Sequence, residues 1–227
     1  MSASQDYAAS SPAGSGQTEP PRDCPLCPRL AAFRADLSRE QPDWFNAPVP
    51  SFGDPDARLL VVGLAPGKSG ANRTGRPFTG DYAGDLLYPT LIRHGFGRGV
   101  FDARPDDGLE LVDCLITNAV RCVPPQNKPT GPEITTCRTF LDGQIRALKT
   151  LSVILVLGRI AHDSTLVALG LKRSAAAFVH AGAAALPGPA GPVTLVSSYH
   201  CSRYNVNTNR LTAAMFDDAV ALARAHL

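Results

Sequence analysis

The sequence predicts a three-layer α/β domain, with helices covering both faces of a parallel β-sheet. Short, wholly apolar runs typical of buried strands alternate along the chain with longer stretches of helical periodicity. Strands separated by helices pair in parallel through right-handed crossovers, which places helices on the two faces of the sheet. A length of 227 residues, 44% of them hydrophobic, is sufficient for one buried core.

Four segments have the composition of buried strands, namely 59–64, 111–120, 153–158 and 194–199. Helical periodicity covers 132–150, 159–169 and 211–227. The first of these helices has a proline near its start and an apolar face at spacings of three and four, made by Ile134, Cys137, Leu141, Ile145 and Leu148. We expect the stretch 181–192, rich in Ala, Gly and Pro, to be a surface loop.

The first residues of the chain differ in composition from the rest. Residues 1–22 are rich in Ser, Ala, Gly and Pro without apolar periodicity, which predicts a flexible tail before a domain at 23–227. No secretory signal or membrane span is present, so we expect a cytoplasmic, monomeric protein that does not bind membranes. Because the net charge is only +2, any affinity for DNA must come from a local basic face.

Four cysteines are candidate metal ligands. Cys24 and Cys27 form a C-x-x-C pair, and Cys122 and Cys137 follow much later, separated by fourteen residues. Such a set suits a structural zinc or a [4Fe–4S] cluster. The spacing favours the cluster, because zinc sites usually use two short pairs. The alternative is that Cys122 and Cys137 are simply buried apolar residues.

A glycine-rich segment, 63–81, follows the first strand and carries five glycines. It matches neither the P-loop nor the dinucleotide pattern, which argues against a nucleotide cofactor. It offers an aromatic ring (Phe78), a carboxylate (Asp81) and two guanidiniums (Arg73 and Arg76), an inventory that suits a nucleotide in DNA. The alternative is that Phe78 belongs to the core and Asp81 caps the next helix.

Several motifs together resemble the uracil-DNA glycosylase superfamily, and specifically its cluster-containing type-5 branch. They are GLAPGKSGANRTGRPFTGD, ITNAVRC, LGRIAH and HCSRYNVNTNRLT, in that order, together with the four cysteines. The resemblance implies an α/β/α sandwich around a four-stranded parallel sheet. It also implies that Cys24, Cys27, Cys122 and Cys137 hold a [4Fe–4S] cluster.

The resemblance further implies which residues meet the flipped base. Phe78 corresponds to the stacking aromatic, Asn118 to the residue that contacts the base edge, and His200 to the histidine of the second motif. The turn after the first strand, which includes Gly63, Leu64 and Ala65, is expected to line the base pocket. Where other branches place an acidic or amide residue, this turn has none, which is itself a mark of the type-5 branch and leaves Asp81 as the candidate to activate water.

These residues predict a monofunctional glycosylase that extrudes a base and hydrolyses its glycosidic bond. His200 would stabilise the departing base, and Tyr204 or Arg203 would fill the vacated stack. The other residues expected to contact DNA are Arg73, Arg76, Ser202, Asn205 and Asn207. We expect uracil, hypoxanthine and xanthine in double-stranded DNA as substrates, with single-stranded DNA as a further form.

Three alternatives remain at the level of sequence. The first is a uracil-only enzyme like the type-4 branch, which is disfavoured because that branch's acidic residue after the first strand is missing. The second is a non-catalytic, cluster-containing DNA-binding or sensing protein, although Asp81, Asn118 and His200 are all present. The third is a zinc-stabilised nucleotide-binding protein.

Overall fold

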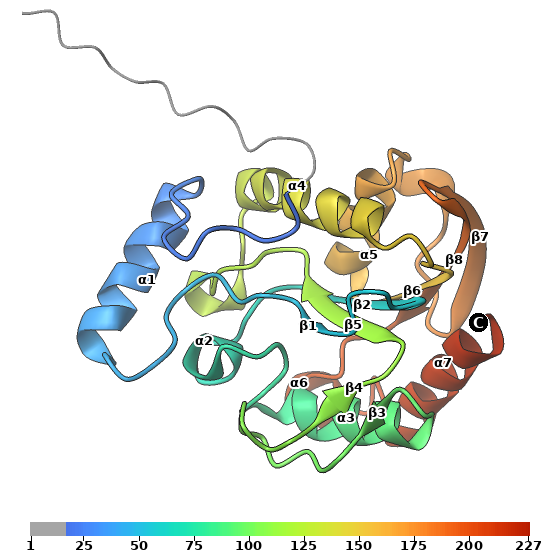
Figure 1. Ribbon diagram of the computed structural model, residues 1–227, viewed down its shortest axis with the longest axis horizontal. Coiled ribbons are helices and arrows are strands. Elements are labelled where there is room, and N and C mark those ends of the chain that lie inside the picture. Colours follow the sequence, from blue (N-terminus) through green and yellow to red (C-terminus); the bar gives the residue numbers. More distant parts are fainter. Residues whose placement is uncertain (1–16) are drawn as a thin grey trace, which may run out of the picture.

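The computed structural model describes residues 17–227, and within them six strands form one sheet in the order β1-β5-β2-β6-β8-β7 (Figure 1). Its strands are β1 (Phe52–Gly53), β2 (Leu59–Gly63), β5 (Cys114–Asn118), β6 (Val153–Leu157), β7 (Gly182–Gly188) and β8 (Gly191–Ser198). The four central strands are parallel, whereas β1 and β7 pair antiparallel at the two edges. The predicted parallel core is therefore confirmed, and two antiparallel edge strands extend it.

Helices cover both faces of this sheet, as the sequence predicted. The α-helices of the described residues are α1 (Pro28–Glu40), α2 (Ala71–Thr74), α3 (Tyr82–Arg93), α4 (Gly131–Ala147), α5 (Arg159–Ala168), α6 (Arg203–Asn207) and α7 (Ala213–Ala225). In Figure 1, α4 and α5 lie above the sheet, and α3 and α7 lie below it. A small second sheet pairs β3 (Gly97–Arg98) with β4 (Glu110–Leu111).

The central strands are buried on both faces, which explains their continuous apolar sequences. Every residue of β2, β5 and β6 is buried. Successive side chains of β2 point to opposite faces. Leu59 and Val61 lie in an apolar cluster with α3 and α7. Leu60 and Val62 lie in a second cluster with α4 and α5.

The prediction of a surface loop at 181–192 is wrong, because most of this stretch is strand. β7 pairs antiparallel with β8 through a tight turn, with Leu186 opposite Val193 and Pro187 opposite Pro192. Ala, Gly and Pro are poor strand formers by propensity. They are tolerated here because β7 is an edge strand, where proline leaves no central ladder bond unmade.

Two residues of the predicted tail at 1–22, Thr18 and Glu19, contact the domain. Residues 1–16 of the predicted tail lie outside the described residues. The remainder packs against the domain through Arg121, whose side chain is 1% exposed. The Arg121 guanidinium donates to the Glu19 carboxylate at 2.9 Å and to the Thr18 carbonyl at 3.0 Å.

Among residues 17–227, no helix is both long enough and apolar enough to cross a membrane.

Removing the charge of Glu19 should destabilise the fold. We expect Glu19→Gln to lower the free energy of unfolding by about 1–3 kcal/mol, because the buried Arg121 guanidinium loses its carboxylate partner. Urea unfolding followed by circular dichroism measures the change. Asp23→Asn, at an exposed carboxylate nearby, should change stability by less than about 0.5 kcal/mol. Equal stabilities of both variants and the unmodified chain would contradict the assignment.

Candidate active site

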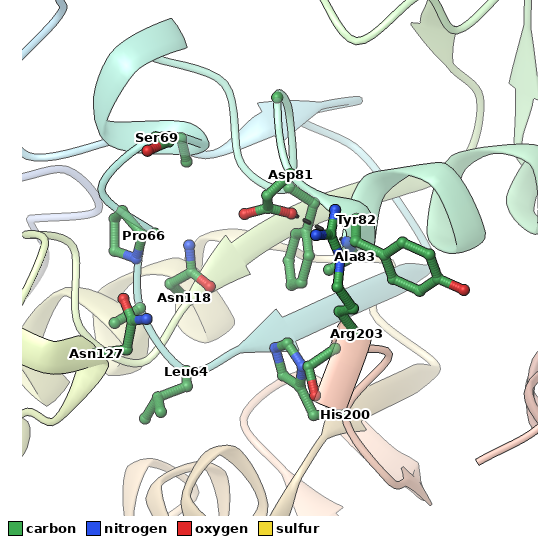
Figure 2. Close-up of a pocket in the computed structure, with 16 residues that line it drawn as sticks. Leu64, Pro66, Ser69, Asp81, Tyr82, Ala83, Asn118, Asn127, His200 and Arg203 are labelled. Carbon is green, nitrogen blue, oxygen red and sulfur yellow. Dashed lines mark hydrogen bonds between the residues drawn. The ribbon is translucent and has the colours of Figure 1, made fainter. Parts of the chain in front are cut away.

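A cavity of about 480 Å³ opens at the carboxyl ends of the central strands, where a parallel α/β sheet is expected to bind its ligand. The residues from the sequence prediction that line it are Leu64, Ala65, Phe78, Asp81, Asn118, His200, Ser202 and Arg203. Figure 2 shows Asp81, Asn118 and His200 arranged around one space. They come from the N-terminus of α3, the end of β5 and the turn after β8, so the fold brings together three segments distant in sequence.

Phe78 forms one wall of the cavity and has a strained backbone. Its φ of 53° lies in the left-handed region, which is rare for a bulky side chain, and such strain is characteristic of functional sites. The ring is 7% exposed. It reaches this position because Gly63 has no side chain, since a Cβ there would lie 2.5 Å from Phe78 Cζ.

Gly63 is not among the residues that line the cavity, and its predicted contact with the base stays a prediction. Besides the clash with Phe78, a Cβ on Gly63 would lie 2.4 Å from Asn118 Oδ1. The role of this glycine is to admit the two side chains that do face the cavity.

Asp81 both caps α3 and lines the cavity. Its Oδ1 accepts a hydrogen bond from the Ala83 N–H at 3.1 Å, which caps α3. Its Oδ2 lies beside Gly70, where a Cβ would come within 2.3 Å of that oxygen. Burial raises the pKa of Asp81 above its ordinary value, although the backbone hydrogen bonds oppose this shift. The carboxylate is therefore a stronger base than a solvated aspartate.

His200 is a neutral imidazole at physiological pH. Burial in the site lowers the pKa of His200 to about 4, because desolvation penalises the charged ring. Its ring centroid lies 6.0 Å from that of Phe78. The Asn205 side chain holds the His200 backbone carbonyl with a hydrogen bond of 2.8 Å. His200 can therefore act as a hydrogen-bond donor without carrying a positive charge.

Asn118 presents a free amide to the same cavity. It is 3% exposed. Within the described part of the chain, its side chain has no hydrogen-bond partner. A carboxamide can donate and accept at once, so Asn118 is able to pair with the edge of a planar ligand.

The segment after His200 lies at the mouth of the cavity. Several of its residues were predicted to contact DNA, and the structure departs from that prediction at one of them. Tyr204 is 72% exposed, and the Arg203 guanidinium lies 5.5 Å from the centre of the Tyr82 ring. Ser202 caps the short helix α6, and Asn207 is exposed. Asn205, expected to contact DNA, instead points inward to the His200 carbonyl. Its amide is thus committed to positioning His200.

The predicted DNA contact by Arg76 is also wrong. Its guanidinium is 4% exposed and forms a two-pronged ion pair with Asp107, at 2.8 and 2.6 Å. The Arg76 hydrogen bonds lower the pKa of Asp107 well below its usual range. A guanidinium buried in this way is not presented to a phosphate at the surface. Arg73, by contrast, is exposed on α2.

The fold gathers the four predicted metal ligands around a second, smaller cavity. Cys24 and Cys27 precede and begin α1, Cys122 follows β5, and Cys137 lies on α4. Burial raises the pKa of the bare Cys122 and Cys137 thiols to about 11 and about 12, so a bound metal would have to displace their protons. In residues 17–227, no group of three or more His, Cys, Asp or Glu side chains meets the geometry of a metal-ion site.

Two N–H donors point at sulfur atoms of this set. The Arg34 guanidinium donates to Cys122 Sγ at 3.0 Å, and the Arg121 backbone N–H donates to Cys137 Sγ at 3.2 Å. Such bonds favour thiolates over thiols. The remaining cysteines, Cys114 and Cys201, are fully buried in the apolar core.

Three polar residues that line the cavity, Ser69, Tyr82 and Asn127, were not predicted from the sequence. Asn127 lines the cavity from the segment after β5 and has a φ of 56° in the left-handed region. Asparagine tolerates this conformation better than most residues. The sequence PPQNKP is a recognisable turn signal, but nothing local indicates that the turn faces Asp81 and His200.

The fold and the cavity together define an enzyme that binds a planar, polar ligand at the edge of a parallel α/β sheet. Comparison with known proteins then gives the family. The model of the uracil DNA glycosylase superfamily matches residues 50–224. The chain therefore belongs to the uracil DNA glycosylase superfamily.

Individual relatives agree with this assignment. The type-5 uracil-DNA glycosylase of Thermus thermophilus is 44% identical over 207 residues, which cover 88% of this chain and 92% of the relative. The type-5 enzyme of Pyrobaculum aerophilum is 38% identical, with 89% and 88% coverage. A type-4 uracil-DNA glycosylase of Pyrobaculum aerophilum is 37% identical over 150 residues, 66% of this chain and 62% of the relative. The predicted resemblance to the type-5 branch is confirmed.

The Arg76–Asp107 pair should be structural. We expect Arg76→Ala to lower the free energy of unfolding by about 3–5 kcal/mol, because it leaves the buried Asp107 carboxylate without a cation. Arg73→Ala, at an exposed site of the same loop, should cost less than about 0.5 kcal/mol. Chemical denaturation of both variants measures the difference. If Arg76→Ala changed the free energy of unfolding only slightly but greatly lowered the affinity for DNA, the predicted DNA contact by Arg76 would be correct.

Proposed function

We propose that this protein hydrolyses the glycosidic bond of uracil in DNA and accepts hypoxanthine and xanthine as well. The observation that carries the proposal is the convergence of Phe78, Asp81, Asn118 and His200 on one cavity at the carboxyl ends of the strands. The names of the type-5 relatives support uracil as a substrate. Such an enzyme works in the compartment that holds the DNA.

The catalytic step follows from the positions of these side chains. A base extruded from the duplex stacks on Phe78, and the Asn118 amide pairs with its polar edge. As the bond between C1′ and the base nitrogen breaks, its electron pair leaves with the base. The neutral His200 donates a hydrogen bond to the base oxygen on which that charge collects. A preorganised donor of this kind typically contributes about 10²–10³ in rate.

Asp81 acts on the water that replaces the base. Its Oδ2, which is not used in capping α3, accepts a proton as the water oxygen bonds to C1′. The negative carboxylate also favours the positive charge that develops on the sugar. No lysine lines the cavity among the described residues, which is consistent with direct hydrolysis without a covalent step.

Double-stranded DNA is the proposed partner, bound across the mouth of the cavity. The exposed Arg73, Arg203 and Asn207 side chains offer donors to phosphates. Tyr204, the most exposed aromatic residue of this segment, is placed to enter the stack that the extruded base vacates. The same surface would also accept a single strand.

Substrate breadth is proposed from the turn after β2. Its residues that line the cavity include Leu64, Ala65 and Pro66, none of which has a polar side chain to select one base edge. Selection is weak in a pocket that does not require a particular hydrogen-bonding partner. The alternative is a uracil-only enzyme, which the shorter match to type-4 relatives makes less favoured.

We also propose that Cys24, Cys27, Cys122 and Cys137 hold a [4Fe–4S] cluster. Support comes from the four thiols around one cavity, from the two N–H donors aimed at sulfur, and from the preference of such clusters for four cysteine ligands. The bound cluster would supply a structural cross-link between the start of α1, the segment after β5, and α4.

Single substitutions test the glycosylase proposal. The chain is incubated with duplexes that contain one uracil or one hypoxanthine, and abasic sites are then cleaved with alkali. We expect cutting at both lesions, with losses of about 10²-fold or more for Asp81→Ala and His200→Ala, and a loss for Asn118→Ala as well. Cutting at uracil alone would favour the type-4-like alternative. An intact, folded chain that cuts neither lesion would favour a DNA-binding or sensing protein.

The pH dependence distinguishes the roles of Asp81 and His200. Asp81 must be ionised to act as a base, so the rate should fall as the pH drops through its raised pKa. His200 stays neutral down to about pH 4 and should not contribute a step near its ordinary value of 6.5. Single-turnover rates across pH should therefore show the same acid limb in His200→Gln as in the unmodified enzyme. A limb near pH 6.5 that disappears in His200→Gln would contradict this assignment.

A further inference from the structure

Arg34 occupies a core position of α1 that an apolar residue would ordinarily fill. The inward face of this helix consists of Leu30, Arg34 and Leu37, at the spacing of one helical stripe. Arg34 is only 5% exposed. A charged side chain at such a position is costly unless the protein supplies a specific partner.

The contacts of Arg34 connect two of the four cysteine positions. Its Nη1 donates to Cys122 Sγ at 3.0 Å, and its Nη2 donates to the Cys24 carbonyl at 2.8 Å. These two cysteines come from the segment before α1 and the segment after β5. One guanidinium therefore holds the two segments at a set separation.

The charge of Arg34 has no carboxylate partner within the described residues. The other buried arginines do have one, since Arg76 pairs with Asp107 and Arg121 pairs with Glu19. A buried cation without an anion is strongly unfavourable. The atom in contact with Arg34 that can carry negative charge is Cys122 Sγ, and a neutral thiol would not compensate the guanidinium.

We infer that Arg34 is a positioning residue and counter-cation for an iron–sulfur cluster held by the four cysteines. The inference rests on the cluster proposed above and extends it to a residue outside the ligand set. Arg34 stabilises the Cys122 sulfur as a thiolate and fixes its distance from the Cys24 backbone. A hydrogen bond and a positive charge at a ligand sulfur favour the reduced, more negative state, and so raise the reduction potential.

The test compares three variants of the complete, anaerobically purified protein. Arg34→Gln removes the charge and Arg34→Lys keeps it without the two-pronged contact. Arg39→Gln is the control, at an exposed arginine of the same helix. The readouts are iron and sulfide per chain, the rate at which visible absorbance bleaches with a chelator and ferricyanide, and the midpoint potential.

We expect Arg34→Gln to bleach about 10- to 100-fold faster and to have a lower midpoint potential. Arg34→Lys should bleach faster but keep a potential near that of the unmodified protein, and Arg39→Gln should change neither value. If Arg34 had only a structural role, the midpoint potential would not depend on whether the substituted side chain keeps the positive charge. If Arg34→Gln fails to fold, Arg34→Lys decides, because bleaching at the unmodified rate overturns the inference.

Two outcomes distinguish the failure of this inference from the failure of the proposed cluster or of the proposed glycosylase activity. Iron and sulfide in the unmodified protein, with unmodified bleaching and potential in Arg34→Gln, would overturn the role of Arg34 alone. A protein without iron and sulfide that still excises uracil would overturn the cluster, and Arg34 with it, but not the glycosylase.

Discussion

Parallel pairing of β2 with β5 sets the geometry on which the site depends. The register places Gly63 opposite Asn118, and pairing continues into the turns beyond, where the Ala119 N–H donates to the Gly63 carbonyl and the Val120 N–H to the Leu64 carbonyl, both at 2.9 Å. The absent side chain of Gly63 leaves the space into which Phe78 and Asn118 project. A shift of one residue in this register would put Thr117 or Ala119 opposite Gly63 and turn the Asn118 side chain toward the other face of the sheet.

The strained loop that carries Phe78 is held by buried polar contacts on both sides. The Tyr88 hydroxyl donates to the Pro77 carbonyl at 2.6 Å, and Arg76 Nε donates to Thr79 Oγ1 at 2.7 Å while its other nitrogens bind Asp107. Left-handed backbone at a bulky residue costs about 1–3 kcal/mol, so it persists only where its surroundings enforce it. Arg76 therefore stabilises the loop that carries Phe78 from within the protein, and it does not lie on the DNA-facing surface.

Burial shifts the two titratable groups of the cavity in opposite directions, and both shifts suit the proposed reaction. Desolvation makes the Asp81 carboxylate more basic and keeps the His200 imidazole neutral. The same segment that begins at Asn118 ends at Cys122, so the cysteine site and the base pocket share one stretch of backbone. The packing of α1 and α4 around those cysteines therefore also constrains the position of Asn118.

The sequence alone determined the central sheet, the family and most of the site. Continuous apolar runs identify strands buried on both faces, and the helix at 132–150 agrees with α4, whose start is marked by the capping box of Thr130 and Glu133. Motifs could also identify Asp81, Asn118 and His200, because these residues stand at the ends of strands or the start of a helix. Only the tertiary structure decided that β7 is a strand, that Arg76 and Asn205 turn inward, and that Asn127 reaches the cavity. The physical reason is that composition does not record which partner a residue meets. Asp107, which holds Arg76, lies 31 residues away. The partners of β7 and Asn205 are near in sequence, but β8 and the turn at His200 take their positions from the sheet and not from local composition.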